Sequence, residues 1–122
     1  MKPGYKGIQR IVKATEFSIQ GLKAAWKNEA AFRQEVVLVF ILVPFALLIP
    51  IALLTKLILI GSLFLILIVE LINSAIEAVV DRVGKEHHEL SGQAKDIGSS
   101  AVLLTLILAL FTWLSVIVDF II

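Results

Sequence analysis

Four polar residues in the middle of the chain have the types and the spacing most suited to chemistry. Glu70, Asn73, Glu77 and Asp81 come directly after the apolar run 57–69. Because a helix advances about 100° per residue, the last three lie at about −60°, −20° and +20° from Glu70. All four therefore share one narrow stripe of a predicted helix. Ionisable groups in a membrane helix are costly and usually mark a functional site, so the stripe predicts a carboxylate site at a membrane edge.

Two carboxylates of this stripe, with one from an earlier segment, have the chemistry of a magnesium site. Glu29 precedes the first long apolar segment, and Glu70 and Glu77 belong to the stripe. Mg²⁺ prefers oxygen ligands and is commonly held by one or two carboxylates together with substrate phosphates. Glu70 is the deepest of the three and is suited to act as a general base. Lys95 and Asp96 stand near the start of the last predicted helix, where a lysine and free N–H groups favour phosphate.

The same residues also admit structural explanations. A polar stripe can hold helices together through hydrogen bonds across their interface, and the polar segment 85–92 can be an ordinary solvated loop. His87 and His88 are adjacent and do not share a helix face, so we expect no transition-metal site there. Ala94 and Gly98 form a small-xxx-small pair, which predicts a close helix contact rather than chemistry.

Composition restricts the class of protein. The chain has 122 residues, and 59% of them are hydrophobic, which is far more than a soluble domain of this length contains. Any chemistry must therefore be built from membrane spans and their short flanks. The absence of cysteine excludes disulfides and cysteine-rich metal sites. The sequence also contains no Walker A pattern and no protein-kinase glycine-rich loop, so neither of those soluble nucleotide-binding folds is supported.

The apolar pattern predicts a single all-α membrane domain over residues 1–122. Apolar residues recur at helical spacing over about 5–27, which is typical of an amphipathic helix lying in the membrane interface. Three further helices, over about 30–48, 54–83 and 93–120, are apolar enough to span a membrane. Pro50 is expected to end the first span, and Ser91 is expected to cap the last helix. Three spans enclose a site poorly, so we also expect an oligomer.

Basic residues predict the orientation of these helices. Seven Lys and Arg residues precede the first span and three lie near the second-to-third loop, whereas Lys56 alone lies in the first-to-second turn. The positive-inside rule then puts the N-terminus and the segment 82–95 in the cytoplasm and the C-terminus on the other side.

Three segments of the chain together resemble the prokaryotic diacylglycerol kinases. They are Glu70–Arg82 (ELINSAIEAVVDR), Asn28–Glu35 (NEAAFRQE) and Glu89–Ser99 (ELSGQAKDIGS). The resemblance covers nearly the whole chain. It implies a homotrimer of three-span subunits in the bacterial inner membrane, with a periplasmic C-terminus. It further implies transfer of the γ-phosphate of ATP to the hydroxyl of diacylglycerol, with Mg²⁺, to give phosphatidic acid in phospholipid metabolism and lipid recycling.

The resemblance also implies a role for each matching residue. Glu70 would take the proton of the lipid hydroxyl with Asn73 in support, and Glu29 and Glu77 would bind the metal. Nucleotide would contact Arg10, Phe17, Glu29, Glu77, Glu86, His87, His88, Lys95 and Asp96. The lipid would contact Arg10, Ala14, Thr15, Glu16, Phe17, Ser18, Ile19, Lys23, Ala24, Ala25, Trp26, Ala31, Phe32, Arg33, Gln34, Glu35, Glu70, Ser99 and Trp113. The implied partners are ATP, diacylglycerol, membrane lipid and two further copies of the chain, with no nucleic acid.

Two positions depart from the family pattern, and two other functions stay open. Phe17 stands where many members carry tyrosine, and Ile19 replaces a frequent tryptophan. An undecaprenol kinase would share the polar stripe, and a small proton-coupled transporter would use Glu70 as its proton carrier. The transporter hypothesis gives Lys95 and Asp96 no function. Diacylglycerol is the preferred acceptor because segment 89–96 is closer to that branch.

Overall fold

The computed structural model describes residues 4–84 and 88–122, and its elements are all helices. They are α1 (Gly7–Asn28), α2 (Ala30–Leu48), α3 (Leu53–Val83) and α4 (Glu89–Ile121). No strand occurs within these two ranges, so the prediction of an all-α protein is confirmed. By length and hydropathy, α2, α3 and α4 can each cross a membrane, which also confirms the prediction of three apolar spans.

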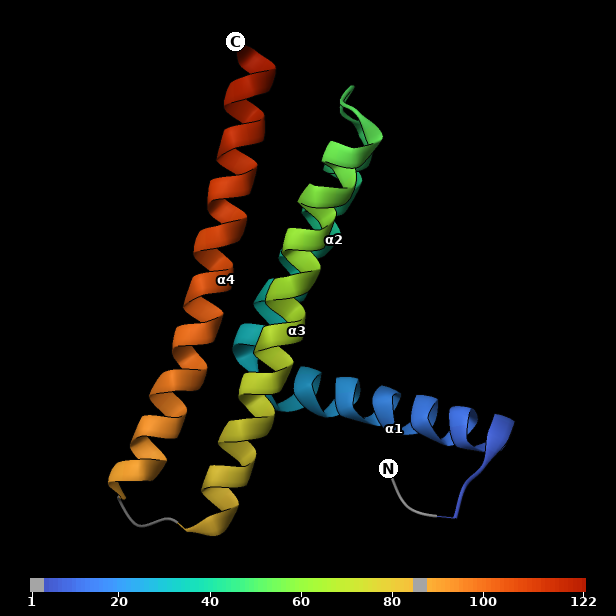
Figure 1. Ribbon diagram of the computed structural model, residues 1–122, viewed down its shortest axis with the longest axis vertical. Helices are drawn as coiled ribbons and strands as arrows, with labels where there is room; N and C mark the ends of the chain where they lie inside the picture. The colour runs from blue at the N-terminus through green and yellow to red at the C-terminus, as the bar shows by residue number, and fades with distance from the viewer. Residues whose placement is uncertain (1–3, 85–87) are drawn as a thin grey trace.

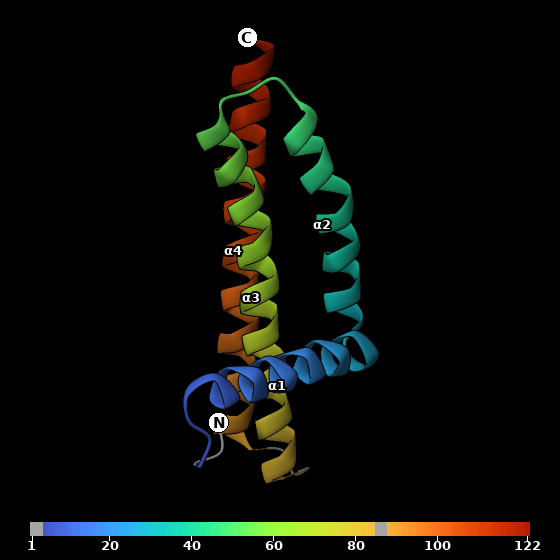
Figure 2. The same cartoon turned by 90° about the vertical axis from the view of Figure 1, so that its right-hand side faces the viewer.

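The two longest helices form an antiparallel pair, and the other two join it from one side (Figure 1). α3 packs most extensively against α4 and less extensively against α2. α1 runs crosswise to the other three helices, as the view turned by 90° also shows (Figure 2). In both views the end of α3 lies toward one end of the bundle, on the same side as α1. The turn after α2 and the C-terminus lie toward the other.

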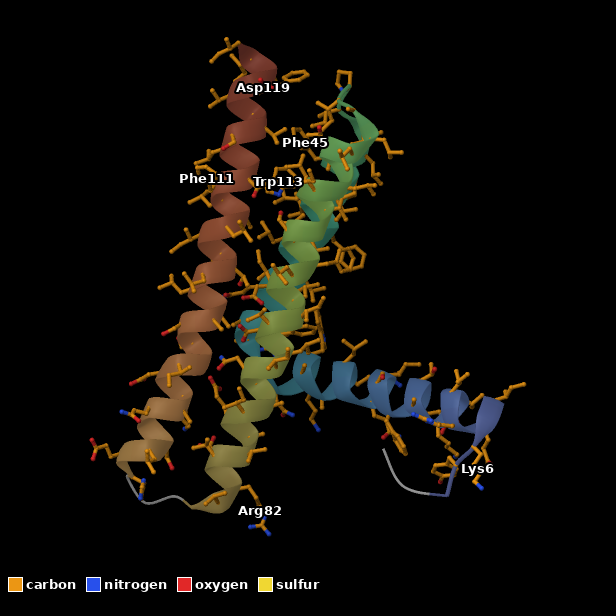
Figure 3. The ribbon with its side chains drawn as sticks, in the orientation of Figure 1. Lys6, Phe45, Arg82, Phe111, Trp113 and Asp119 are labelled. Atoms are coloured by element: carbon orange, nitrogen blue, oxygen red, sulfur yellow. The ribbon has the colours of Figure 1, made fainter. Side chains whose placement is uncertain are left out.

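Most large apolar side chains of α2, α3 and α4 face outward. Phe40 is 76% exposed, Leu104 66% and Phe111 70%, and Phe111 points away from α2 and α3 (Figure 3). Water does not tolerate contiguous apolar surface on this scale in a soluble monomer, whereas acyl chains do. The protein is therefore a multi-pass membrane protein.

The apolar core fills the half of the bundle that is distant from α1. Trp113 and Phe45 face each other there, with ring centroids 6.4 Å apart (Figure 3). The Trp113 indole N–H donates to Ser62 Oγ at 3.2 Å, and the Ser62 hydroxyl donates to the Leu59 carbonyl at 2.7 Å. This contact fixes the register of α4 against α3. The buried core residues are Ala46, Leu59, Leu63, Ile66, Ala109 and Trp113.

Cations from a following helix cap the ends of α1 and α2. A helix leaves its last four carbonyls without an intrahelical donor. Arg33 of α2 donates to the Trp26 and Lys27 carbonyls of α1, at 2.7 and 3.2 Å. Lys56 of α3 donates in the same way to the Leu47 carbonyl of α2, at 2.7 Å. The two connections around these caps are consequently tight, and they hold α1, α2 and α3 together.

The start of the last helix differs from the prediction. α4 begins at Glu89, four residues before the expected start at 93, and its N-cap is His88 rather than Ser91. The His88 side chain accepts the Leu90 N–H at Nδ1, at 3.1 Å, which supplies the cap that the sequence pattern assigned to serine. Ser91 therefore lies inside the first turn.

Candidate active site

Among residues 4–84 and 88–122, the carboxylate with the least exposed side chain belongs to Glu70, in the second half of α3. Glu70 is only 6% exposed and Asn73 7%, although both side chains are polar. α1 crosses α3 immediately after this point, since both helices line one groove there, and Figure 1 shows the crossing partway along α3. The buried polar pair thus lies close to the level at which the crosswise helix passes α3.

Three further carboxylates surround Glu70. Glu29, Glu35 and Glu77 are near enough for the charge of each to interact with that of Glu70. They come from the α1–α2 junction, from α2 and from α3. Carboxylates that are near enough for their charges to interact repel one another when ionised. Such a cluster is stable only when protons or a cation neutralise part of its charge, so the arrangement favours a cation.

Glu29 is fixed by the backbone of the α1–α2 junction. Its own conformation is extended, with φ −118° and ψ 105°, and it is the single residue between the two helices. Its N–H donates to the Ala25 carbonyl at 2.9 Å, and its carbonyl accepts the Arg33 N–H at 3.2 Å. Glu29 thus caps the end of α1 and the start of α2. These backbone contacts hold the Glu29 side chain at the corner where α1 and α2 meet α3.

Glu35 belongs to the carboxylate cluster although the sequence assigned it to the lipid. Its Oε2 atom is buried and has no hydrogen-bond partner, and its charge interacts with that of Glu70. A buried polar atom without a partner is costly, so this oxygen is available to a ligand. The only signal for this in the sequence is its place six residues after Glu29, in the first half of the following helix.

Asn73 connects α3 to α4. Its Nδ2 donates to Glu77 Oε1 at 3.1 Å, which agrees with the predicted shared face. Its Oδ1 is buried without a hydrogen-bond partner and lies against Gly98 of α4, so closely that an added Cβ at Gly98 would overlap it. The prediction that Gly98 makes a close helix contact is therefore confirmed.

An ion pair joins the last turns of α3 to the first turns of α4. Lys95 Nζ lies 2.6 Å from Asp81 Oδ1, and both side chains are partly exposed. Lys95 is thus oriented toward the end of the polar stripe by a residue of that stripe. Asp96 lies on the outside of the same turn. Of the predicted nucleotide residues nearby, His88 caps α4, while Glu86 and His87 lie outside the described residues.

A groove of about 550 Å³ lies in the angle between α1 and α3, beside the carboxylate cluster. Its α3 wall consists of Leu71 and the small residues Ser74, Ala75 and Ala78. These recur three or four residues apart and so lie on one face of the helix. Its α1 wall consists of Ser18, Gly21, Leu22, Ala24, Ala25, Asn28 and Glu29. The groove is mostly apolar with a carboxylate at its end, which suits an amphiphile.

Comparison with known proteins gives the family. The model of the prokaryotic diacylglycerol kinase family matches residues 16–117. The chain is 56% identical over 107 residues to the diacylglycerol kinase of Escherichia coli K12, covering 88% of each chain. The Pseudomonas aeruginosa diacylglycerol kinase is 45% identical over 113 residues, covering 93% of this chain and 92% of that one. The Haemophilus influenzae diacylglycerol kinase is 42% identical over 107 residues, or 88% and 91%.

The chain belongs to the prokaryotic diacylglycerol kinase family. The match includes most of the residues that the resemblance singled out, from Glu16 to Trp113, and leaves Arg10, Ala14 and Thr15 before its start.

The donor set of this family member fits Mg²⁺. The cluster offers carboxylate oxygens and an unpartnered buried carboxylate oxygen on Glu35, which are hard ligands of the kind that Mg²⁺ takes. Within residues 4–84 and 88–122, no three His, Cys, Asp or Glu side chains are grouped so that they alone could hold a metal ion. An ion held by Glu29 and Glu77 would therefore complete its coordination with water and with the phosphates of a substrate.

The predicted lipid residues do not all lie together. Ser18, Ala24 and Ala25 line the groove with Glu29, whereas Arg10, Ala14 and Thr15 line a second hollow along α1. Glu16, Phe17, Ile19, Lys23, Trp26, Ala31, Gln34 and Ser99 are exposed, and Phe32 is buried.

Two of the predicted lipid residues make structural contacts within the chain. Arg33 caps α1, and Trp113 lies in the core on Ser62. Ser62 is eight residues from Glu70, or about 12 Å along α3. The Trp113 indole is therefore well separated from the Glu70 carboxylate of the same chain.

Proposed function

We propose that the protein transfers the γ-phosphate of ATP to the hydroxyl of diacylglycerol, with Glu70 as the general base. The family membership supports the reaction. The observation that carries the assignment of the base is the buried Glu70 carboxylate, whose charge interacts with those of Glu29, Glu35 and Glu77. Glu70 directly precedes Leu71 of the groove wall, and Glu29 lines the groove itself. A carboxylate in such surroundings can accept a proton from an alcohol while water is kept away from the reacting oxygen.

In the proposed reaction, the lipid hydroxyl oxygen forms a bond to the γ-phosphorus as the bond from that phosphorus to the β–γ bridging oxygen breaks. The hydroxyl proton passes to Glu70, and ADP leaves with the bridging oxygen. Phosphoryl transfer needs in-line positioning and neutralisation of charge more than covalent participation by the enzyme. Bound Mg²⁺ would supply part of that neutralisation.

The remaining residues bind and orient the two substrates. Glu29 and Glu77 would hold Mg²⁺, and Asn73 keeps Glu77 in place through its amide. Lys95, at the aqueous ends of α3 and α4, would bind phosphate as a point charge. Arg10, Phe17, His88 and Asp96, with Glu86 and His87, are proposed to contact the nucleotide. The groove between α1 and α3 would receive the glycerol end of the lipid.

The position of α1 supports access from two phases. Its apolar residues include Ile8, Ile11 and Leu22, which are exposed within the monomer, and its polar face carries several lysines. We propose that α1 lies in the cytoplasmic interface, with the N-terminus in the cytoplasm and the C-terminus in the periplasm of the bacterial inner membrane. ATP would then arrive from water and diacylglycerol from the bilayer.

A homotrimer is part of the proposal. The groove is open on one side within a single chain, and α4 presents an exposed apolar surface that includes Leu103, Leu106 and Leu110. Contacts between copies along such surfaces would close the site. They would also bring the exposed Ser99 of one subunit toward the site of the next, where it is proposed to contact lipid. Trp113 is proposed to contact lipid away from that site, because it packs on Ser62 within its own chain.

The test is phosphate transfer from labelled ATP in mixed micelles containing Mg²⁺ and diacylglycerol. The wild-type protein is expected to form labelled phosphatidic acid. Glu70→Gln keeps the size and polarity of the side chain but removes its basicity, so kcat should fall by at least about 10²-fold while the oligomer and its thermal midpoint are retained.

Other acceptors and a transport assay separate the alternatives. Phosphorylation of undecaprenol in preference to diacylglycerol would replace the proposed acceptor. Proton-driven flux in vesicles without ATP would replace the kinase by a transporter. A wild-type level of transfer by Glu70→Gln would contradict the assignment of the base alone.

A further inference from the structure

One glycine lies at the closest approach of α3 and α4. Gly98 is buried, and an added Cβ would overlap Oδ1 of Asn73. At the chain's other six glycines, including Gly92 of the same helix, an added Cβ would meet nothing within 4 Å. Gly98 is therefore the one glycine whose missing side chain makes room for another residue.

The residue in that space has its amide oriented by both neighbours. Asn73 is 93% buried, its Oδ1 faces Gly98 without a hydrogen-bond partner, and its Nδ2 donates to Glu77 at 3.1 Å. Turning the amide over would direct two N–H donors at the α4 backbone and an oxygen at a carboxylate, which is repulsive. The present orientation allows the Gly98 Cα–H groups to face the oxygen, a weak contact that recurs between closely packed helices.

We propose that Gly98 is a positioning residue: its missing side chain makes the space in which Asn73 holds Glu77 within the carboxylate cluster. A Cβ at this position would push the Asn73 amide toward α3 and break its hydrogen bond to Glu77. The consequence for catalysis rests on the proposed function, because it assumes that Glu77 binds Mg²⁺. The packing relation between Gly98 and Asn73 does not depend on that function.

The sign of the stability change makes the packing relation testable. Glycine to alanine in a helix ordinarily stabilises, because alanine has the higher helix propensity. Gly92→Ala, in open space on the same helix, should therefore leave the thermal midpoint in detergent unchanged or slightly raised. Gly98→Ala should lower it by about 5 °C or more.

A double variant isolates the contact with Asn73. In an Asn73→Ala background, the space beside Gly98 is empty, so adding Gly98→Ala should no longer lower the thermal midpoint relative to Asn73→Ala alone. If Gly98→Ala by itself fails to fold, the double variant still tests the contact. Its thermal midpoint is expected to be at least as high as that of Asn73→Ala alone.

The catalytic consequence is read from the Mg²⁺ dependence of phosphate transfer. Gly98→Ala should raise the Mg²⁺ concentration for half-maximal rate several-fold, because Glu77 loses the group that holds it, and Gly92→Ala should not change it. Two outcomes would overturn the proposal: a Gly98→Ala protein with the midpoint and Mg²⁺ dependence of Gly92→Ala, or an equal loss of midpoint in the wild-type and Asn73→Ala backgrounds. An unchanged Mg²⁺ dependence with the expected midpoints would refute only the link to Glu77. Absence of kinase activity in the wild type would leave the midpoint test intact.

Discussion

Lys95 pairs with Asp81, and this carboxylate competes with the phosphate that Lys95 is proposed to bind. Asp81 holds its ammonium at 2.6 Å, so a phosphate must displace the Asp81 carboxylate in order to bind Lys95. The two side chains are 43% and 65% exposed, and an exposed ion pair contributes little to stability, about 0–1 kcal/mol. The pair is thus weak enough to exchange for a more highly charged phosphate.

Asp81→Asn should therefore lower the KM for ATP while kcat and the thermal midpoint change little. The substitution frees Lys95 and removes a negative charge beside the proposed phosphate site. Lys95→Met is the matched comparison and should raise the KM for ATP at least about tenfold, a loss of about 1.4 kcal/mol. Steady-state kinetics over a range of ATP concentrations measures both. A higher KM for Asp81→Asn would mean that Asp81 orients Lys95 instead of competing for it.

At the residue scale, the sequence predicts which residues share a face of one helix and that Gly98 makes a close helix contact, but it does not predict which residue of another helix each one meets. The periodicity of α3 puts Asn73 and Glu77 on one face, and their hydrogen bond agrees. The contacts of Asn73 with Gly98, of Asp81 with Lys95 and of Ser62 with Trp113 depend on the register of α4 against α3. That register is set by side-chain packing, and neither helix shows it alone.

At the scale of the elements, helix ends depend on caps that come from other parts of the chain. Pro50 follows the end of α2 as predicted, yet the carbonyl of Leu47 is satisfied by Lys56 of α3. The start of α4 was predicted too late because a serine, a common N-cap, stands near a histidine that serves instead. Long apolar segments are therefore predictable from periodicity, while their ends depend on which single side chain supplies the cap.

Lys56→Met should destabilise the bundle without affecting phosphate transfer. The variant keeps an unbranched side chain of similar length but leaves the Leu47 carbonyl without this donor, at a cost of about 1 kcal/mol. Lys56 precedes Glu70 by fourteen residues, or about 21 Å along α3, so kcat per folded protein should not change. Lys56→Arg retains a cationic donor and should keep the wild-type thermal midpoint. Equal midpoints for the Met and Arg variants would mean that the hydrogen bond to Leu47 contributes nothing.

At the scale of the whole molecule, the polar chemistry and the apolar core occupy different halves of one bundle. The core around Trp113 lies far from α1, and the carboxylates gather where α1 crosses α3. A reaction between a water-soluble and a lipid-soluble substrate needs this division, because the charged groups must meet ATP at the surface while the spans stay in lipid. The sequence predicts the division through its charge distribution, in which Lys56 is the one basic residue at the far turn.

The same division fixes the expected orientation in the membrane, which cysteine labelling can measure directly. The chain contains no cysteine, so single replacements report one position each. Lys6 lies at the start of α1 and Arg82 in the last turn of α3, both toward one end of the bundle (Figure 3). Asp119 lies in the last turn of α4, toward the other end of the bundle. With the N-terminus in the cytoplasm, a membrane-impermeant maleimide should label Asp119→Cys in spheroplasts, and Lys6→Cys and Arg82→Cys only after permeabilisation. All three sites are partly or fully accessible in the folded chain, so lack of labelling reflects the membrane and not burial. Labelling of Lys6→Cys in intact spheroplasts would reverse the orientation and separate the carboxylate site from cytoplasmic ATP.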